Sequence, residues 1–143
     1  MATYWIWKSY WWIKAMKILI DTSFLLKCVQ KGGDLFYKLE ETLKVPIEPI
    51  ILENVLKELK NISSIKGKKS KEAKLALEIA NKYNKIAYNE NIPTDEALLE
   101  IAFKNKYPVL TCDIKLKKKL REKKIPVIFL KKDGKIDVEG ILE

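Results

Sequence analysis

Apolar residues fall into two alternating patterns along the chain after position 16. Short apolar runs bounded by charged residues, proline or glycine are typical of buried strands. The runs that predict strands are Lys17–Ile20, Val45–Ile47, Ile86–Tyr88, Tyr107–Thr111 and Pro126–Leu130. Between these runs, apolar residues recur every three or four positions, which predicts helices. The helical segments are Thr22–Gln30, Asp34–Leu43, Ile50–Asn61, a long helix capped by Ser70, Thr94–Lys104 and Asp113–Lys124. Strands that alternate with helices predict an α/β protein with a mainly parallel sheet.

Turn and loop signals separate the predicted elements. Gly32 and Gly33 end the first helix, and the sequence ISSIKGKKS over Ile62–Ser70 predicts a polar, basic loop. The pair Asp133-Gly134 is a strong signal for a hairpin turn. Four phenylalanines fall on apolar faces and are interpreted as core residues: Phe24, Phe36, Phe103 and Phe129.

The first fifteen residues differ in composition from the rest and contain all four tryptophans, Trp5, Trp7, Trp11 and Trp12. Lys8 and Lys14 interrupt this stretch, which is too short to span a bilayer and lacks the features of a signal peptide. Met16 begins MKILIDTS, which resembles a protein start. We therefore divide the chain into a Trp-rich extension, residues 1–15, and a folded domain, residues 16–143. An anchor at a membrane surface, a partner-binding arm and a base-stacking platform are the alternative interpretations of the extension.

The chain is strongly basic. Its 143 residues are enough for one domain, and 28 Lys and Arg against 19 Asp and Glu give a net charge of +9. Such a balance suits a polyanionic partner such as nucleic acid, although a solubilising lysine-rich surface explains it equally well. The basic residues that we expect to contact such a nucleic acid are Lys68, Lys69, Lys115, Lys117, Lys118, Lys119 and Arg121. Because lysines act as point charges, we expect them to bind the phosphate backbone more than the bases.

The absence of histidine narrows the chemistry. It excludes an imidazole base, a His-ligated zinc site and a Ser-His-Asp triad. The two cysteines, Cys28 and Cys112, are too few for a thiolate zinc site, and they favour a reducing, cytoplasmic location. Catalysis would therefore depend on carboxylates, hydroxyls, lysines or a bound metal ion.

Four acidic residues occupy positions that a parallel sheet brings together. Asp21 and Asp113 follow apolar strands, Asp95 lies in the first turn of a helix, and Glu58 borders an apolar helical stripe. Taken alone, each aspartate is a helix cap or first-turn acid, and Glu58 is a surface residue. Together they predict a carboxylate cluster that a cation must neutralise, and oxygen ligands of this kind suit Mg²⁺ or Mn²⁺. Such a centre activates a bound water and stabilises charge on a phosphodiester.

The segments around these acids resemble PIN-domain nucleases. They are KILIDTSFLL at Lys17–Leu26, VLKEL at Val55–Leu59, TDEALLEIA at Thr94–Ala102 and VLTCDIKLKKKL at Val109–Leu120. The order and spacing of all four segments carry the resemblance, which covers Met16 to about Gly140. It implies a three-layer α/β/α sandwich and a metal-dependent ribonuclease.

The resemblance also assigns residues. Asp21, Glu58, Asp95 and Asp113 match the acidic quartet of the family, both as catalytic residues and as metal ligands. Ser23 and Thr111 match hydroxyls that support the first and last aspartates. Glu96 is an alternative ligand to Asp95, whereas Glu53, the rival of Glu58, lies outside the VLKEL match.

The carboxyl-terminal segment resembles the PIN branch of the ribosomal-RNA-processing nuclease and its archaeal relatives, with Lys131 and Lys132 where that branch usually has an arginine-containing motif. PIN domains are also toxins of toxin–antitoxin pairs. We therefore predict an endoribonuclease in RNA processing or a toxin, with RNA as substrate and an antitoxin or ribosome-assembly factor as partner. Homodimerisation follows from the resemblance alone, and a membrane partner is not expected. The alternative is a non-catalytic RNA-binding or ribosome-assembly module with the same fold.

Overall fold

The sheet at the centre of the protein has six strands in the order β3-β2-β1-β4-β5-β6. The computed structural model describes residues 14–32, 35–89 and 91–142. All neighbouring strands are parallel except β5 and β6, which are antiparallel. The strands are β1 (Met16–Ile20), β2 (Ile47–Leu52), β3 (Asn84–Ile86), β4 (Val109–Thr111), β5 (Val127–Leu130) and β6 (Ile136–Glu139).

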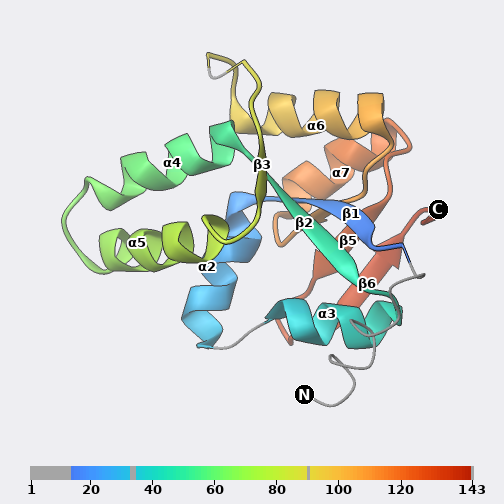
Figure 1. Cartoon of the computed structure of the whole chain (residues 1–143), viewed down its shortest axis with the longest axis horizontal. Coiled ribbons are helices and arrows are strands. Elements are labelled where there is room, and N and C mark those ends of the chain that lie inside the picture. The colour runs from blue at the N-terminus through green and yellow to red at the C-terminus, as the bar shows by residue number, and fades with distance from the viewer. Residues whose placement is uncertain (1–13, 33–34, 90, 143) are drawn as a thin grey trace.

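Helices cover both faces of the sheet, as the three-layer prediction requires (Figure 1). They are α2 (Thr22–Lys31), α3 (Leu35–Leu43), α4 (Glu53–Ser63), α5 (Lys68–Ala80), α6 (Thr94–Asn105) and α7 (Ile114–Glu122). Right-handed crossovers place the helices that connect β1, β2 and β3 on one face, and α6 and α7 on the other. Figure 1 shows α6 and α7 lying together, apart from the group formed by α2, α4 and α5.

The core explains why the strands are continuous apolar runs. Ile18, Leu19 and Ile20 of β1 are all fully buried, because helices cover both sides of this central strand. In α2, Phe24 and Leu25 point into the same core. The Asp133-Gly134 turn joins β5 to β6 as predicted, and Gly134 has a φ of 89°, a backbone conformation that L side chains rarely adopt.

Several sequence-based predictions about the fold were wrong. The second strand was expected over Val45–Ile47, but it begins at Ile47 and runs to Leu52, so α4 begins at Glu53 rather than Ile50. The basic loop expected over Ile62–Ser70 is shorter, because α4 ends at Ser63 and α5 begins at Lys68, and the strand expected at Ile86–Tyr88 is Asn84–Ile86. Ser70 lies inside α5 and donates a hydrogen bond to Ser63 O at 2.7 Å, instead of capping the helix. Phe103 is 67% exposed, whereas the other three phenylalanines are buried.

The Trp-rich extension up to Ile13 and the predicted cap Asp34 lie outside the described residues. Cys28 and Cys112 do not form a disulfide bond with each other. Across residues 14–32, 35–89 and 91–142, no helix combines the length and the apolar character needed to cross a membrane.

Candidate active site

The site lies where the strand order of the sheet reverses. The chain proceeds from β1 to β2 and β3 on one side, and from β4 to β5 on the other. Parallel sheets form a crevice at such a switch point, beyond the carboxyl ends of the two strands. Asp21 follows β1 directly and donates its backbone N–H to Leu110 O at 3.0 Å, while Asp113 lies two residues after β4. The two aspartates therefore flank the same crevice.

Two hydroxyl groups hold the side chain of Asp21. Ser23 Oγ donates to Asp21 Oδ2 at 2.7 Å, and Thr111 Oγ1 donates to the same oxygen at 2.8 Å. The backbone N–H of Cys112 in turn donates to Ser23 Oγ at 2.9 Å. Ser23 and Thr111 thus both bond to Asp21, although the family resemblance places Thr111 beside Asp113, and together they connect α2 to the end of β4.

Asp113 serves as the N-cap of α7. Its Oδ1 accepts hydrogen bonds from Lys115 N at 2.9 Å and Leu116 N at 3.4 Å. Its own backbone N–H donates to Thr111 Oγ1 at 3.0 Å. The helix-cap interpretation of this residue therefore holds, and Thr111 links Asp113 to Asp21 through a single hydroxyl.

Glu58 of α4 and Asp95 of α6 interact electrostatically with Asp21. The pKa of Asp21 is raised from 3.8 to about 6, chiefly because the group is buried. The charges of Asp95 and Glu58 contribute to the increase, and the hydrogen bonds from Ser23 and Thr111 oppose it. A buried carboxyl that faces two other acids tends to keep its proton unless a cation offsets the charge. Burial and the charge of Asp21 also raise the pKa of the Cys112 thiol to about 11, which keeps that thiol protonated.

Asn54 was not identified from the sequence, and it positions α6 beside α4. Its Nδ2 donates to Asn89 O at 2.9 Å and to Ile92 O at 3.2 Å, so it fastens the segment that leads into α6. Thr94 Oγ1 at the start of α6 donates to Asn54 O at 3.5 Å. The only sequence signal was a polar residue shortly after the apolar run Ile50–Leu52, and Asn54 is nonetheless buried.

The donor set of the site is suited to a hard divalent cation, because it consists of carboxylates and hydroxyls. Within the described part of the chain, however, no group of three or more acidic or cysteine side chains has the spacing of a ready-made metal site. One oxygen of Asp113 is engaged as a helix cap, and Asp95 Oδ2 lies 3.9 Å from Lys119 Nζ. The site thus brings Asp21, Glu58 and Asp95 within electrostatic reach, and their coordination of a metal remains a prediction.

A cavity of about 320 Å³ opens between α4 and the start of α6. Glu58 and Lys57 line it from α4, and Thr94 lines it from α6. Glu58, one of the predicted catalytic acids, therefore borders this cavity beside the crevice. Glu96, the alternative ligand to Asp95, is exposed on the first turn of α6.

The predicted RNA-binding residues divide into an exposed group and a group engaged in packing, and among the exposed ones Lys119 also pairs with Asp95 at 3.9 Å. Lys115, Lys118 and Lys119 are exposed on α7, and Lys68 and Lys69 are exposed at the start of α5. Lys117 forms an ion pair with Glu139 at 2.9 Å and lies 4.6 Å from the centroid of the Phe129 ring. Arg121 donates to Ile125 O at 3.0 Å. Lys117 and Arg121 therefore already support the packing of α7.

The fold and the site together define an α/β protein with an acidic centre at the switch point of its sheet. A family model described as "PIN like domain" matches residues 18–133, which is most of the chain. The chain belongs to this family, and the resemblance to PIN-domain nucleases that the four sequence segments indicated is confirmed.

Individual proteins of similar sequence or structure agree with this family assignment. Ribonuclease VapC4 of Methanocaldococcus jannaschii is 31% identical over 130 residues, which are 88% of this chain and 98% of the relative. The structure of the PIN domain endonuclease Utp24 matches with a TM-score of 0.72 and 27% identity, over 89% of this chain and 93% of that one. VapBC2 from Rickettsia felis, bound to a fragment of promoter DNA, matches with a TM-score of 0.55 and 19% identity, over 73% of this chain and 92% of that one. The last match shows the shared fold alone.

Proposed function

We propose that this PIN-domain protein is an endoribonuclease that depends on a divalent metal ion, Mg²⁺ or Mn²⁺. The observation that carries the proposal is the buried carboxyl of Asp21 at the switch point, held by two hydroxyls and facing the charges of Asp95 and Glu58. The relationship to Ribonuclease VapC4 and to the endonuclease Utp24 supports the same conclusion.

Asp21, Glu58, Asp95 and Asp113 are the residues that would hold the metal ion, with Glu96 as an alternative to Asp95. When bound, a divalent ion lowers the pKa of a coordinated water and stabilises negative charge on a phosphodiester. Ser23 and Thr111 keep Asp21 oriented toward the crevice, so their role is to position an acid. This division of roles requires no histidine, and the chain has none.

The exposed lysines Lys115, Lys118 and Lys119 begin two residues after Asp113 and supply the phosphate-binding surface in this proposal. Contacts of lysines with the backbone are independent of base sequence and weaken as salt concentration rises. Lys68 and Lys69 provide a second exposed basic position on α5. We therefore propose that RNA binds across α7, with the cleaved phosphodiester at the crevice.

A non-catalytic RNA-binding or ribosome-assembly module is the second candidate. It is favoured by one observation: the acids in the described ranges 14–32, 35–89 and 91–142 do not form a ready-made metal site. One carboxylate oxygen of Asp113 in particular already serves as a helix cap.

The experiment that tests the proposal is cleavage of a labelled, structured RNA in Mn²⁺, in Mg²⁺ and in EDTA. Wild-type protein should cleave only with a metal ion, and Asp21→Asn should not cleave. The matched control is Glu41→Gln, which changes an exposed acid of α3. Cleavage by pure Asp21→Asn would refute the site, whereas salt-sensitive binding without cleavage by either protein would favour the binding module.

Two cellular roles follow from the proposed activity: processing of RNA, including ribosomal RNA, and toxicity controlled by an antitoxin. Induced expression in a bacterial host separates them, because a toxin arrests growth and Asp21→Asn does not. An antitoxin or a ribosome-assembly factor, a homodimer and a cytoplasmic location remain predictions from the sequence.

A further inference from the structure

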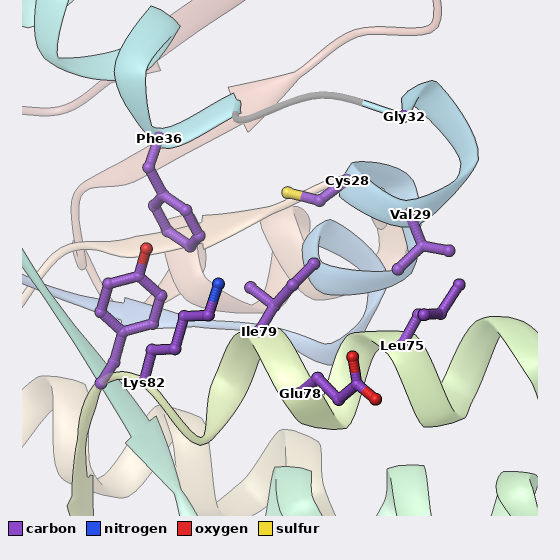
Figure 2. Close-up of a pocket in the computed structure, with 9 residues that line it drawn as sticks. Cys28, Val29, Gly32, Phe36, Leu75, Glu78, Ile79 and Lys82 are labelled. Atoms are coloured by element: carbon purple, nitrogen blue, oxygen red, sulfur yellow. The ribbon is translucent and has the colours of Figure 1, made fainter.

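Two cavities in the described part of the chain differ in character. The larger one, about 490 Å³, lies between α2, α3 and α5, and Figure 2 shows apolar side chains such as Val29, Leu75 and Ile79 along it. Its lining among the described residues includes none of the four predicted acids. The smaller cavity, about 320 Å³, lies between α4 and the start of α6, and Glu58 is part of its lining. The smaller cavity therefore adjoins the proposed active site.

One wall of the smaller cavity is a polar face of α4. Residues three and four positions apart share a helix face, and the four lining residues have this spacing: Asn54, Lys57, Glu58 and Asn61. Lys57 and Asn61 are exposed at the mouth, whereas Asn54 is only 3% exposed and forms the floor. The carboxamide of Asn61 carries a hydrogen-bond donor and an acceptor side by side. This wall is therefore suited to the polar edge of a ligand.

The opposite wall is largely apolar. Ile92 and Pro93, which lead into α6, line the cavity there together with Thr94. Ile92 is half-buried and Pro93 is exposed, so both present apolar atoms at the surface. An unpaired nucleobase has flat apolar faces and a hydrogen-bonding edge, and proteins that read single-stranded RNA contact both. A cavity with one polar and one apolar wall matches this combination.

The floor of the cavity contains an unused hydrogen-bond acceptor. Asn54 Nδ2 donates to the carbonyls of Asn89 and Ile92, but Asn54 Oδ1 is buried and accepts no hydrogen bond within residues 14–32, 35–89 and 91–142. Buried acceptors normally have a partner, because leaving one unpaired is unfavourable. Nucleotides carry donors of the required kind on their amino groups and on the 2′-hydroxyl.

We propose that the cavity between α4 and α6 binds one unpaired nucleotide of the RNA, next to the phosphodiester at the crevice. This inference rests on the proposed ribonuclease function, because Glu58 belongs to both the cavity and the acidic site. Asn61 contacts the edge of the base, and Ile92 and Pro93 contact its face. Since a carboxamide pairs with N6 and N7 of adenine together, adenosine is the preferred nucleotide. The cavity thus adds a base preference to a lysine surface that binds the phosphate backbone.

Binding of short RNAs in EDTA tests the proposal without cleavage. The probes are labelled single strands of equal length that contain only adenosine, only cytidine or only uridine, and fluorescence anisotropy measures their affinity. Wild-type protein should bind the adenosine strand at least about five-fold more tightly than the others, the lower end of discrimination by a bidentate pair. Asn61→Ala should bind all three strands equally. The slope of log K against log salt should not change, because no phosphate contact is lost.

The matched control is Asn81→Ala, which changes an exposed asparagine directly after α5 that does not line the cavity. Alanine is a better helix former than asparagine, so we expect Asn61→Ala to keep the fold, and circular dichroism verifies this. Equal binding of the three strands by wild-type protein would overturn the proposal. A preference for adenosine that Asn61→Ala and Asn81→Ala retain equally would overturn it as well.

The failure of this inference is distinguishable from the failure of the proposed function. Metal-dependent cleavage by a protein that binds all three strands equally would refute the nucleotide cavity alone. A preference for adenosine that Asn61→Ala abolishes, in a protein that does not cleave RNA with any metal ion, would support the cavity and refute the nuclease.

Discussion

The hydroxyl of Thr111 donates a hydrogen bond to Asp21 Oδ2 at 2.8 Å and accepts one from the backbone N–H of Asp113 at 3.0 Å. One buried side chain thus ties the ends of β1 and β4 together at the proposed active site. Ser23 Oγ lies 3.2 Å from the same hydroxyl, so three polar groups from two strand ends and a helix form one network.

Replacing Thr111 with valine should destabilise the protein by about 1–3 kcal/mol, because it removes a buried donor to Asp21 and an acceptor for Asp113 N–H. Urea unfolding measures the change in free energy. Thr42→Val is the matched control, since the Thr42 hydroxyl bonds to Lys38 O on the exposed side of α3. Equal stability of the two variants would show that the Thr111 network contributes nothing.

The pKa of Asp21 predicts how stability depends on pH in EDTA. The folded pKa of about 6 lies above the unfolded value of 3.8, so the folded state binds more protons between these values. The contribution of Asp21 to the free energy of unfolding should therefore be largest below pH 4. It should fall by about 3 kcal/mol in total as pH rises through 6, because the folded pKa lies about two pH units above the unfolded one.

Asp21→Asn should remove that fall, because asparagine does not titrate. Unfolding free energies measured at several pH values between 4 and 7.5 for both proteins provide the comparison. A wild-type protein whose stability rises over this range, with the same slope as Asp21→Asn, would contradict the assignment of a raised pKa to Asp21.

A divalent ion that binds the acidic site should stabilise the folded protein. At a concentration about 100 times its Kd, the expected gain is about 2.7 kcal/mol. Thermal unfolding with increasing Mn²⁺ or Mg²⁺ measures it, and Asp21→Asn should show a much smaller gain. If both proteins gain equally, the ion binds elsewhere. This measurement requires no substrate and therefore separates metal binding from catalysis.

The exposed lysines of α7 should set the affinity for RNA. Lys118→Gln and Lys119→Gln should each weaken binding and reduce the slope of log K against log salt by about one, if each contacts one phosphate. Titrations at several salt concentrations measure the slope, with Lys132→Gln, which changes an exposed residue of the β5–β6 turn, as control. An equal effect of all three substitutions would indicate non-specific attraction to a basic surface.

The sequence predicted the order of elements and the positions of Asp21 and Asp113 because apolar runs of buried strands and the acids after them are local features. It misplaced the boundary of β2 because Pro49 was interpreted as a strand end. Pro49 is tolerated there because it pairs with Ile18 on one side, and β3 pairs only from Ile50 onward on the other. Whether proline is tolerated inside β2 depends on the length of the neighbouring strand β3, and no local sequence pattern reveals that length.

The sequence and the family resemblance propose the acids of the site and the hydroxyls of Ser23 and Thr111, but they do not reveal the residue that positions α6. Asn54 fastens the segment before α6 through backbone carbonyls more than thirty residues away, a relationship that only the folded chain displays. Phe103 was interpreted as a core residue, yet it is 67% exposed, because the buried face of α6 is formed by other positions, Ala97, Leu98, Ile101 and Ala102. The contacts of Asn54, in contrast, depend on which element lies opposite and do not follow from periodicity.

The two edges of the sheet resist extension by another molecule. At one edge, β3 is only three residues long, with Asn84 and Lys85 exposed to solvent. At the other edge, β6 reverses direction, and its Glu139 is paired with Lys117 of α7. Short, charged edges of this kind discourage intermolecular strand pairing and the aggregation that follows from it. A homodimer of this chain would therefore assemble through its helices, and the sheet would remain a closed unit of six strands.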